Sequence, residues 1–193
     1  MNITKYIRLS FQNSSEINEF YRSLQLDYPK FFKMDGLSKL GILASEMIFK
    51  EDKNRFEPRV DIAVICFNRS SSLDIDTQYQ ATIYDNDNYF PSPSLFVYTL
   101  PNIVTGEISI RNKFFGETFF YICKNFDARQ IVETVRNTFC DRTTTAVLAA
   151  WIEYFGEKHE VLMMLIENGK ESLEFTEEQV NKLYNSKKLI KYR

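Results

Sequence analysis

An almost unbroken apolar run, Val60–Phe67 (VDIAVICF), constrains the fold of this chain more than any other feature. Polar segments bound the run on both sides, and its length suits a strand better than a helix. A strand with one face in water would alternate apolar and polar residues, whereas this run does not. The run therefore predicts an inner strand of a sheet that is covered by helices on both faces.

Segments that fit such a sheet lie on both sides of this run. Four more strands are expected, at Ile3–Phe11, Thr118–Ile122, Thr143–Phe155 and Val161–Glu167. Helices are expected between and after them, at residues 14–24, 33–51, 73–83, 127–139 and 175–188. Asp35 and Asp127 stand at helix starts, and Thr176 with Gln179 forms a capping box. Because helices alternate with buried strands, the pattern predicts an α/β fold with a mixed, mostly parallel sheet.

The chain of 193 residues has the size of one domain, and it contains no linker or internal repeat. We therefore expect a single domain over residues 1–193. The last two strands are joined by GEKH, in which Gly156 permits a hairpin. This hairpin would make the last strand antiparallel to the others.

Composition excludes several classes of function. The formal charge of −2 is spread along the chain, which argues against binding of nucleic acid. No apolar run approaches the roughly 18 residues of a membrane helix, and the N-terminal segment lacks the apolar core of a signal peptide. Cys66, Cys123 and Cys140 are widely spaced, so neither a disulfide framework nor a metal site is indicated. We expect a cytoplasmic protein without membrane association, metal or cofactor.

The C-terminal tail is basic, with Lys187, Lys188, Lys191 and Arg193. We interpret it as a solvated end, since charged termini are usually exposed.

The segment Phe90–Gly116 (FPSPSLFVYTLPNIVTGEISIRNKFFG) holds three of the five prolines of the chain among many apolar residues. It resembles the segment before the nucleophile in β-ketoacyl-ACP synthases of the thiolase fold. In that family an aromatic-rich loop precedes an asparagine, a glycine on a buried helix, and a loop closed by another glycine. The matching positions are Asn102, Gly106, Ile110 and Gly116.

Two upstream segments carry the same resemblance. KMDGLSKLGILASEMI is similar to the Arg-Met-Asp helix of the family, with Lys33, Met34 and Asp35 at the motif positions. VDIAVICFNRSSSL is similar to the second strand and the loop that follows it. Together the similar segments cover roughly residues 33–168, and the alternative is a buried loop and helix unrelated to that family.

The resemblance implies one half of a thiolase-like fold. The five strands would form a sheet in the order 3-2-1-4-5, with the last strand antiparallel and with Thr118–Ile122 at the edge. In that architecture, Phe90–Gly116 lies between the two halves of the fold, where glycines allow close packing and prolines stiffen the loop.

The resemblance also places the nucleophile position of the family on this chain. The pattern G-P-x-x-x-x-x-T-A-C, laid on GETFFYICKN from Gly116, puts Asn125 where the family has its cysteine. We expect Asn125 within about a residue of the start of the following helix. Cys123 lies two residues earlier, and we expect it to be buried and inert. The family also uses two histidines from its second half, whereas the single histidine here, His159, is expected in a solvated turn.

These residues lead to two main functional hypotheses. The first is a non-catalytic ketosynthase-like partner subunit of a bacterial fatty-acid, polyketide or aryl-polyene-type pathway. The second is a 3-oxoacyl-ACP synthase-type acyltransferase that uses Cys123, with histidines supplied by a partner chain. A module that binds an acyl chain or acyl carrier protein is a further alternative.

The resemblance implies association as well. The edge strand with Phe119, Phe120 and Tyr121, together with the helix Asp127–Phe139, would be left open in a half-fold. Open apolar edges aggregate unless something covers them. We expect a dimer, with a second copy or with a ketosynthase-like partner. The alternative is a monomer in which the helix at 175–188 covers the open layer.

Overall fold

The computed structural model describes residues 1–169, 172–186 and 189–191. Its strands are β1 (Asn2–Phe11), β2 (Ile62–Asn68), β3 (Thr118–Ile122), β4 (Ala146–Phe155), β5 (Lys158–Glu167), β6 (Leu173–Glu174) and β7 (Leu189–Lys191). Its α-helices are α1 (Ser14–Ser23), α2 (Gly36–Ile48), α3 (Leu73–Ala81), α4 (Pro93–Phe96), α5 (Ile103–Asn112), α6 (Ala128–Thr138) and α7 (Glu177–Tyr184). Short 3-10 helices lie at η1 (Pro29–Lys33), η2 (Asn86–Asn88), η3 (Val97–Thr99) and η4 (Phe139–Asp141).

The strands form one mixed sheet in the order β3-β2-β4-β5-β1-β6, and β7 also pairs with β1. β2 is parallel to β3 and β4, whereas β5 is antiparallel to both β4 and β1. The predictions of an antiparallel β5 and of β3 at the edge are therefore confirmed. The predicted order 3-2-1-4-5 is wrong, because β1 lies beyond β5 instead of between β2 and β4.

The composition of the strands explains this correction. β4 has eight consecutive buried residues from its first position, so it needs neighbouring elements on both faces. β1 carries Thr4, Lys5, Arg8 and Ser10, and its residues alternate irregularly between buried and partly exposed. The inner position therefore suits β4, and the outer position suits β1. The two short strands β6 and β7, which pair with β1, were not expected.

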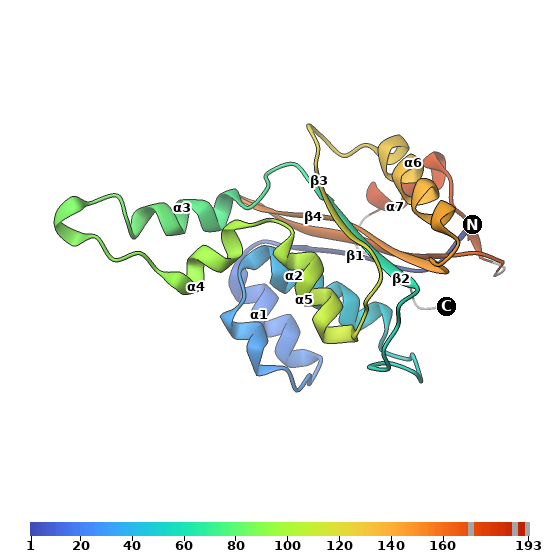
Figure 1. Cartoon of the computed structure of the whole chain (residues 1–193), viewed down its shortest axis with the longest axis horizontal. Coiled ribbons are helices and arrows are strands. Elements are labelled where there is room, and N and C mark those ends of the chain that lie inside the picture. Colours follow the sequence, from blue (N-terminus) through green and yellow to red (C-terminus); the bar gives the residue numbers. More distant parts are fainter. Residues whose placement is uncertain (170–171, 187–188, 192–193) are drawn as a thin grey trace.

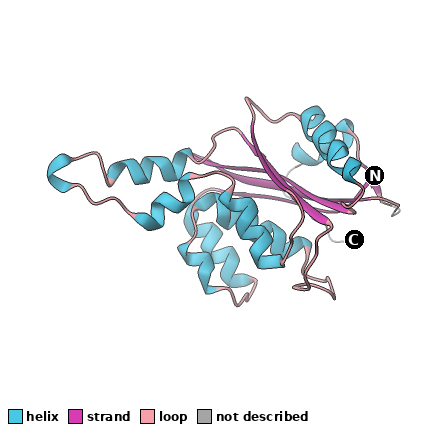
Figure 2. Cartoon of the chain, in the orientation of Figure 1, coloured by secondary structure: helices cyan, strands magenta, loops and turns pink. Residues whose placement is uncertain are grey.

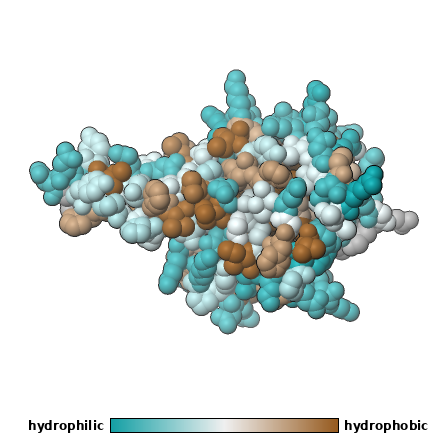
Figure 3. Space-filling view, viewed as in Figure 1, coloured by the Kyte–Doolittle hydropathy of each residue, from teal (hydrophilic) through white to brown (hydrophobic). Residues whose placement is uncertain are grey.

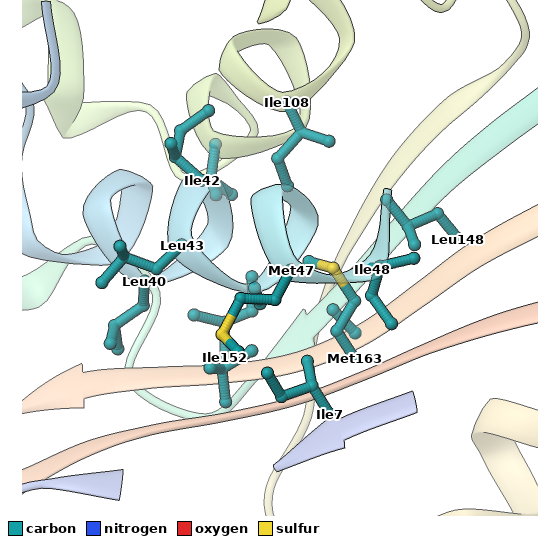
Figure 4. Packing of buried hydrophobic residues seen from close by; sticks show 14 of the residues in the cluster. Ile7, Leu40, Ile42, Leu43, Met47, Ile48, Ile108, Leu148, Ile152 and Met163 are labelled. Atoms are coloured by element: carbon teal, nitrogen blue, oxygen red, sulfur yellow. The ribbon is translucent and has the colours of Figure 1, made fainter. Parts of the chain in front are cut away.

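Helices cover both faces of the sheet, as predicted (Figure 1). Figure 2 shows the same two helical layers with the strands between them. On one face, α1, α2 and α5 pack on alternate residues of the strands, including Val64, Leu148 and Ile152. Figure 4 shows how side chains of α2 and α5 meet those of the strands in this layer. On the other face, α6 and α7 pack on Ile65, Phe67 and the remaining alternate residues.

The predicted C-terminal helix at 175–188 begins with the expected cap, since Thr176 Oγ1 accepts a hydrogen bond from Gln179 N. The observed helix α7 ends at Tyr184, and residues 187–188 lie outside the described part of the chain. Val180 and Leu183 of α7 are buried next to Ile131 and Val135 of α6. α7 therefore extends the helical layer on the α6 face.

Part of the basic tail lies in a strand, whereas its expected solvation stays a prediction. Lys191 closes β7, which pairs with β1 opposite Tyr6. Lys187, Lys188 and Arg193 lie outside the described residues.

The buried helix α2 is held to α5 at two places. Gly41 of α2 faces Val104 of α5 so closely that a Cβ on Gly41 would lie 2.6 Å from Val104 Cγ2. Farther along α2, the buried Glu46 Oε1 accepts from Arg111 Nε of α5 at 2.6 Å and pairs with Arg55 Nη2 at 2.7 Å. Such a buried ion pair fixes the relative position of two helices, because removing one partner leaves an uncompensated charge.

Asp35 is the N-cap of α2, as its place in the sequence predicted. Its two carboxylate oxygens accept from Leu37 N at 3.2 Å and from Ser38 N at 3.1 Å. Burial raises the pKa of Asp35, although these hydrogen bonds act in the opposite direction. The Asp35 carboxylate therefore stabilises the start of α2 as a cap, whereas the burial of its negative charge costs free energy.

Two substitutions of Asp35 separate these contributions. Asp35→Ala is expected to lower the free energy of unfolding by about 1 kcal/mol, because two amide donors lose their acceptor. Asp35→Asn keeps a good capping oxygen without the buried charge, so it is expected to be at least as stable as wild type at neutral pH. Urea unfolding followed by circular dichroism measures both. An equal loss of unfolding free energy in Asp35→Ala and Asp35→Asn would contradict this separation of the capping contribution from the cost of the buried charge.

Candidate functional site

Asn125, on which the sequence resemblance would place the nucleophile position, lies just after β3, in the loop that leads to α6. β3 pairs only with β2, among the described residues, with Cys66 opposite Phe120. Residues 123–126 then connect the strand to Asp127, which is the N-cap of α6. The chain therefore has the strand–loop–helix arrangement in which a nucleophile could stand at a helix start.

Cys123 is a poor nucleophile in this arrangement. Its residue is only 9% exposed, and its thiol faces the carbonyl oxygen of Tyr121 at 4.0 Å. Burial raises the pKa of the Cys123 thiol, and the negative charge of Asp127 raises it further. A reactive cysteine needs the opposite conditions, namely an accessible thiol and a lowered pKa.

Asn125 lies two residues before the N-cap of α6, slightly farther from the helix than we expected. It is exposed and lines a cavity of about 290 Å³. The start of α6 is closed by the side chain of Asp127, whose Oδ1 accepts from Gln130 N at 3.1 Å. A carboxylate at this place repels an anion, so this helix start is unsuited to stabilising an oxyanion.

Among the positions that carry the family resemblance are Met34, Asp35, Asn102, Gly106 and Gly116. All of these except Gly106 lie where helices or loops begin or end. Met34 is buried and directly precedes the N-cap Asp35. Asn102 precedes α5, and its carbonyl oxygen accepts from Thr105 N and Gly106 N. Gly116 precedes β3 and approaches β2 so closely that a Cβ would lie against the Ile62 carbonyl oxygen.

The fifth of these residues, Gly106, makes no close packing contact within this chain, because a Cβ added to it would meet no atom within 4 Å. The expected packing of this glycine against a second half-fold stays a prediction. The close contact between the two helices is made instead by Gly41 of α2. His159 also differs from the prediction, because it lies in β5, half-buried against Tyr154 at 4.4 Å between ring centroids.

The predicted interface is only partly apolar. Of the three predicted strand residues, Phe119 is exposed, while Phe120 and Tyr121 are half-buried. The helix α6 turns its apolar side toward the sheet and α7, and exposes Arg129, Gln130, Glu133 and Asn137. α6 therefore does not present the open apolar layer that the resemblance implied, because α7 covers part of the same layer.

A larger apolar surface lies next to β3. We call it the edge surface; its exposed residues are Phe96, Val97, Leu100, Ile110, Phe115, Phe119 and Ile122. Figure 3 shows apolar side chains gathered on this face of the molecule, over α4, α5 and β3. Five of the seven residues belong to Phe90–Gly116, whose apolar density was visible in the sequence. Burial between two half-folds was the expected reason for that density, and on this chain the residues are exposed.

The described residues offer neither a metal-binding cluster nor a membrane-spanning helix. Residues 1–169, 172–186 and 189–191 contain no group of three or more His, Cys, Asp or Glu arranged to hold a metal ion. In the same residues, every helix is too short or too polar to cross a membrane. All three cysteines are free thiols.

No protein-family model matches the sequence, and no curated protein matches it significantly. Solved structures do match the fold. One is a ketosynthase (ApeO) in complex with its chain length factor (ApeC) from Xenorhabdus doucetiae, with a TM-score of 0.62 and 15% identity over 88% of this chain and 79% of that chain. The ishigamide ketosynthase/chain length factor has a TM-score of 0.69 and 15% identity over 89% of this chain and 63% of that chain.

A third match is AntDE:AntF, a type II PKS acyl-carrier protein in complex with its ketosynthase, with a TM-score of 0.61 and 11% identity. This chain covers 62% of that chain with 86% of its own length. It therefore spans less than two thirds of the second and third of these similar chains. These matches show that the chain has the thiolase-like fold of ketosynthases, in a partial form. Its strand order differs from the one expected for that fold.

Proposed function

We propose that the chain is a non-catalytic ketosynthase-like partner subunit that associates through its edge surface. The observation that carries the proposal is the outer side of β3, which pairs with no other strand of the described residues. Phe119 and Ile122 are exposed there, on the same face as exposed apolar residues of α4 and α5. An unpaired strand edge offers a row of backbone donors and acceptors to another strand. Contiguous exposed apolar patches of this kind mark interaction sites.

The environment after β3 supports the non-catalytic part of the proposal. Asn125 stands in the nucleophile position, the buried Cys123 thiol has a raised pKa, and Asp127 closes the helix start. Each of these features disfavours thiolate attack on an acyl group. A partner role needs none of this chemistry, since it needs only a stable fold and a surface.

The partner that fits this surface is a protein of the same fold. The similar structures include a ketosynthase in complex with its chain length factor, so in those proteins two such chains assemble. We propose a second copy of this chain or a ketosynthase-like chain as the partner. A fatty-acid, polyketide or aryl-polyene-type pathway is the context that this partner implies. Acyl carrier protein is a secondary candidate, by analogy with the third similar structure.

Substitution on β3 tests the edge surface. Phe119→Asp places a charge on a residue that is 43% exposed at the edge, so the fold is expected to persist while association is lost. Phe155→Asp is the matched control, because Phe155 is 40% exposed and lies at the end of β4, outside the edge surface. Light scattering is expected to give a dimer for wild type and for Phe155→Asp, and a monomer for Phe119→Asp.

If wild type is monomeric alone, co-expression and co-purification with a ketosynthase-like protein, taken from the neighbouring genes where they encode one, tests a mixed dimer. The complex is expected to survive Phe155→Asp and to be lost with Phe119→Asp. The proposal would be contradicted if the wild-type protein is monomeric at tens of micromolar and also forms no complex with a ketosynthase-like protein.

Thiol labelling tests the non-catalytic role of Cys123. Because its thiol is buried and its pKa is raised, Cys123 is expected to resist iodoacetamide and the ketosynthase inhibitor cerulenin near neutral pH. Cys140 is exposed and serves as the internal control for labelling by iodoacetamide. Peptide mass spectrometry locates the adducts. A cerulenin adduct that forms on Cys123 in the folded protein and is lost in Cys123→Ser would favour the acyltransferase alternative.

A further inference from the structure

A second polar cavity lies where the start of α2 meets α3, α4 and the end of β4. Its volume is about 280 Å³, which suits a small molecule. The lining residues on which the inference rests are Lys39 of α2, the N-cap Asp35, Asp74 of α3 and Tyr154 of β4. None of them belongs to the edge surface or to the cavity beside Asn125. We call this second cavity the Lys39 cavity.

Lys39 presents an unpaired amine to this cavity. The residue is half-buried, and its Nζ lies 5.8 Å from the centre of the buried Phe31 ring. Nζ makes no hydrogen bond or ion pair with the described residues, and it is not among the fully buried polar atoms that lack a partner. The amine is therefore both unpaired and reachable from the cavity.

The surroundings of Lys39 favour its neutral form. Burial lowers the pKa of Lys39, because the charged ammonium loses water, and the carboxylate of Asp35 opposes this shift only in part. The oxygens of Asp35 already accept hydrogen bonds from the amides of Leu37 and Ser38. Near neutral pH, a larger fraction of Lys39 is thus the nucleophilic amine than is the case for an exposed lysine.

Tyr154 places a hydroxyl donor at the same cavity. Its ring lies so close to Gly36 that a Cβ would not fit there, so the ring is held beside the start of α2. Burial raises the pKa of Tyr154, and the charges of Asp74 and Asp35 raise it further, so the hydroxyl stays protonated. In the described part of the chain Tyr154 Oη has no hydrogen-bond partner, and it is not fully buried. This donor is therefore available to a ligand.

The other side chains of the cavity restrict the class of ligand. With Lys39 neutral, the remaining charged residues of the lining are Asp35, Asp74 and the exposed Lys33, so the cavity is net negative and disfavours an anion. Uncharged hydrogen-bonding side chains complete the polar lining, namely Ser14, Gln78, Ser94 and Tyr98. Such groups suit a ligand with hydroxyl groups.

We propose that Lys39 is a covalent binding site for small neutral hydroxyaldehydes. Lys39 Nζ forms a bond to the aldehyde carbon, and the carbonyl oxygen becomes a hydroxyl by taking up a proton that the nitrogen loses. The nitrogen then loses its second proton and forms a double bond to the carbon, while the hydroxyl leaves as water. Tyr154 Oη donates a hydrogen bond to this oxygen. The product is an imine, and its formation does not depend on the partner role proposed above.

Reductive trapping tests the site on the purified full chain. The protein is incubated near neutral pH with glycolaldehyde and sodium cyanoborohydride, which reduces an imine to a stable secondary amine, and peptide mass spectrometry locates the adducts. At low overall modification, Lys39 is expected to be labelled several-fold faster than the exposed Lys158 and Lys182. Denaturing urea is expected to remove this preference, because it depends on the folded cavity.

Two comparisons separate a built site from a lysine that is merely reactive. Glyoxylate carries a carboxylate in place of the hydroxymethyl group of glycolaldehyde, so the net negative cavity is expected to abolish the preference for Lys39 over Lys182. Tyr154→Phe keeps the ring and removes Oη, and it is expected to slow labelling of Lys39 several-fold while Lys182 is unaffected. Lys33→Arg is the control, because it keeps the exposed charge, and it is expected to label at Lys39 as wild type does.

Circular dichroism checks that each variant is folded, and the glyoxylate comparison on wild type decides if Tyr154→Phe is not. The proposal is overturned if Lys39 in the folded protein is labelled no faster than Lys158 and Lys182. It is also overturned if glyoxylate shows the same preference for Lys39 as glycolaldehyde does, or if folded Tyr154→Phe is labelled at Lys39 as fast as wild type.

Discussion

The pairing of β4 with β2 on one side and with β5 on the other is the constraint on which the rest of the structure depends. β4 is where the parallel part of the sheet meets the antiparallel part, and its first eight residues are buried. Its side chains divide between the two cores, so that Leu148 and Ile152 pack under α2 while Val147 and Ala149 pack under α6 and α7. Both helical layers and the position of β3 at the edge follow from this placement.

The same placement separates two surfaces that carry different chemistry. At the β3 edge, backbone groups and exposed aromatic and aliphatic side chains suit another protein of similar fold. At the far end of β4, the buried residues Trp151 and Glu153 line a cavity together with Phe126 and Tyr184. α7 makes this separation possible, because it covers the layer beside α6 and contributes Tyr184 to the cavity.

Sequence patterns predicted the strands and helices well, because long apolar runs and capping residues such as Asp35 and Thr176 act locally. They failed for the strand order, which depends on which strands need cover on both faces; the polar residues of β1 were the overlooked signal. They also failed for α6, which was expected to present an open apolar layer. The outer side of α6 is polar, and α7 covers part of the apolar layer beside it. The cavity was not predicted, because Glu153 and Trp151 lie in a run whose apolar character dominated the interpretation.

The outer position of β1 has a consequence for how the protein is made. β1 precedes all of its partners in the sequence, since β5, β6 and β7 begin after residue 157. The pairing of β1 with β5 joins segments that are far apart in the sequence, and contacts of high sequence separation are slow to form. Until then, Ile7 and Leu9, which are buried in the folded protein, have no strand beside them and stay exposed to solvent.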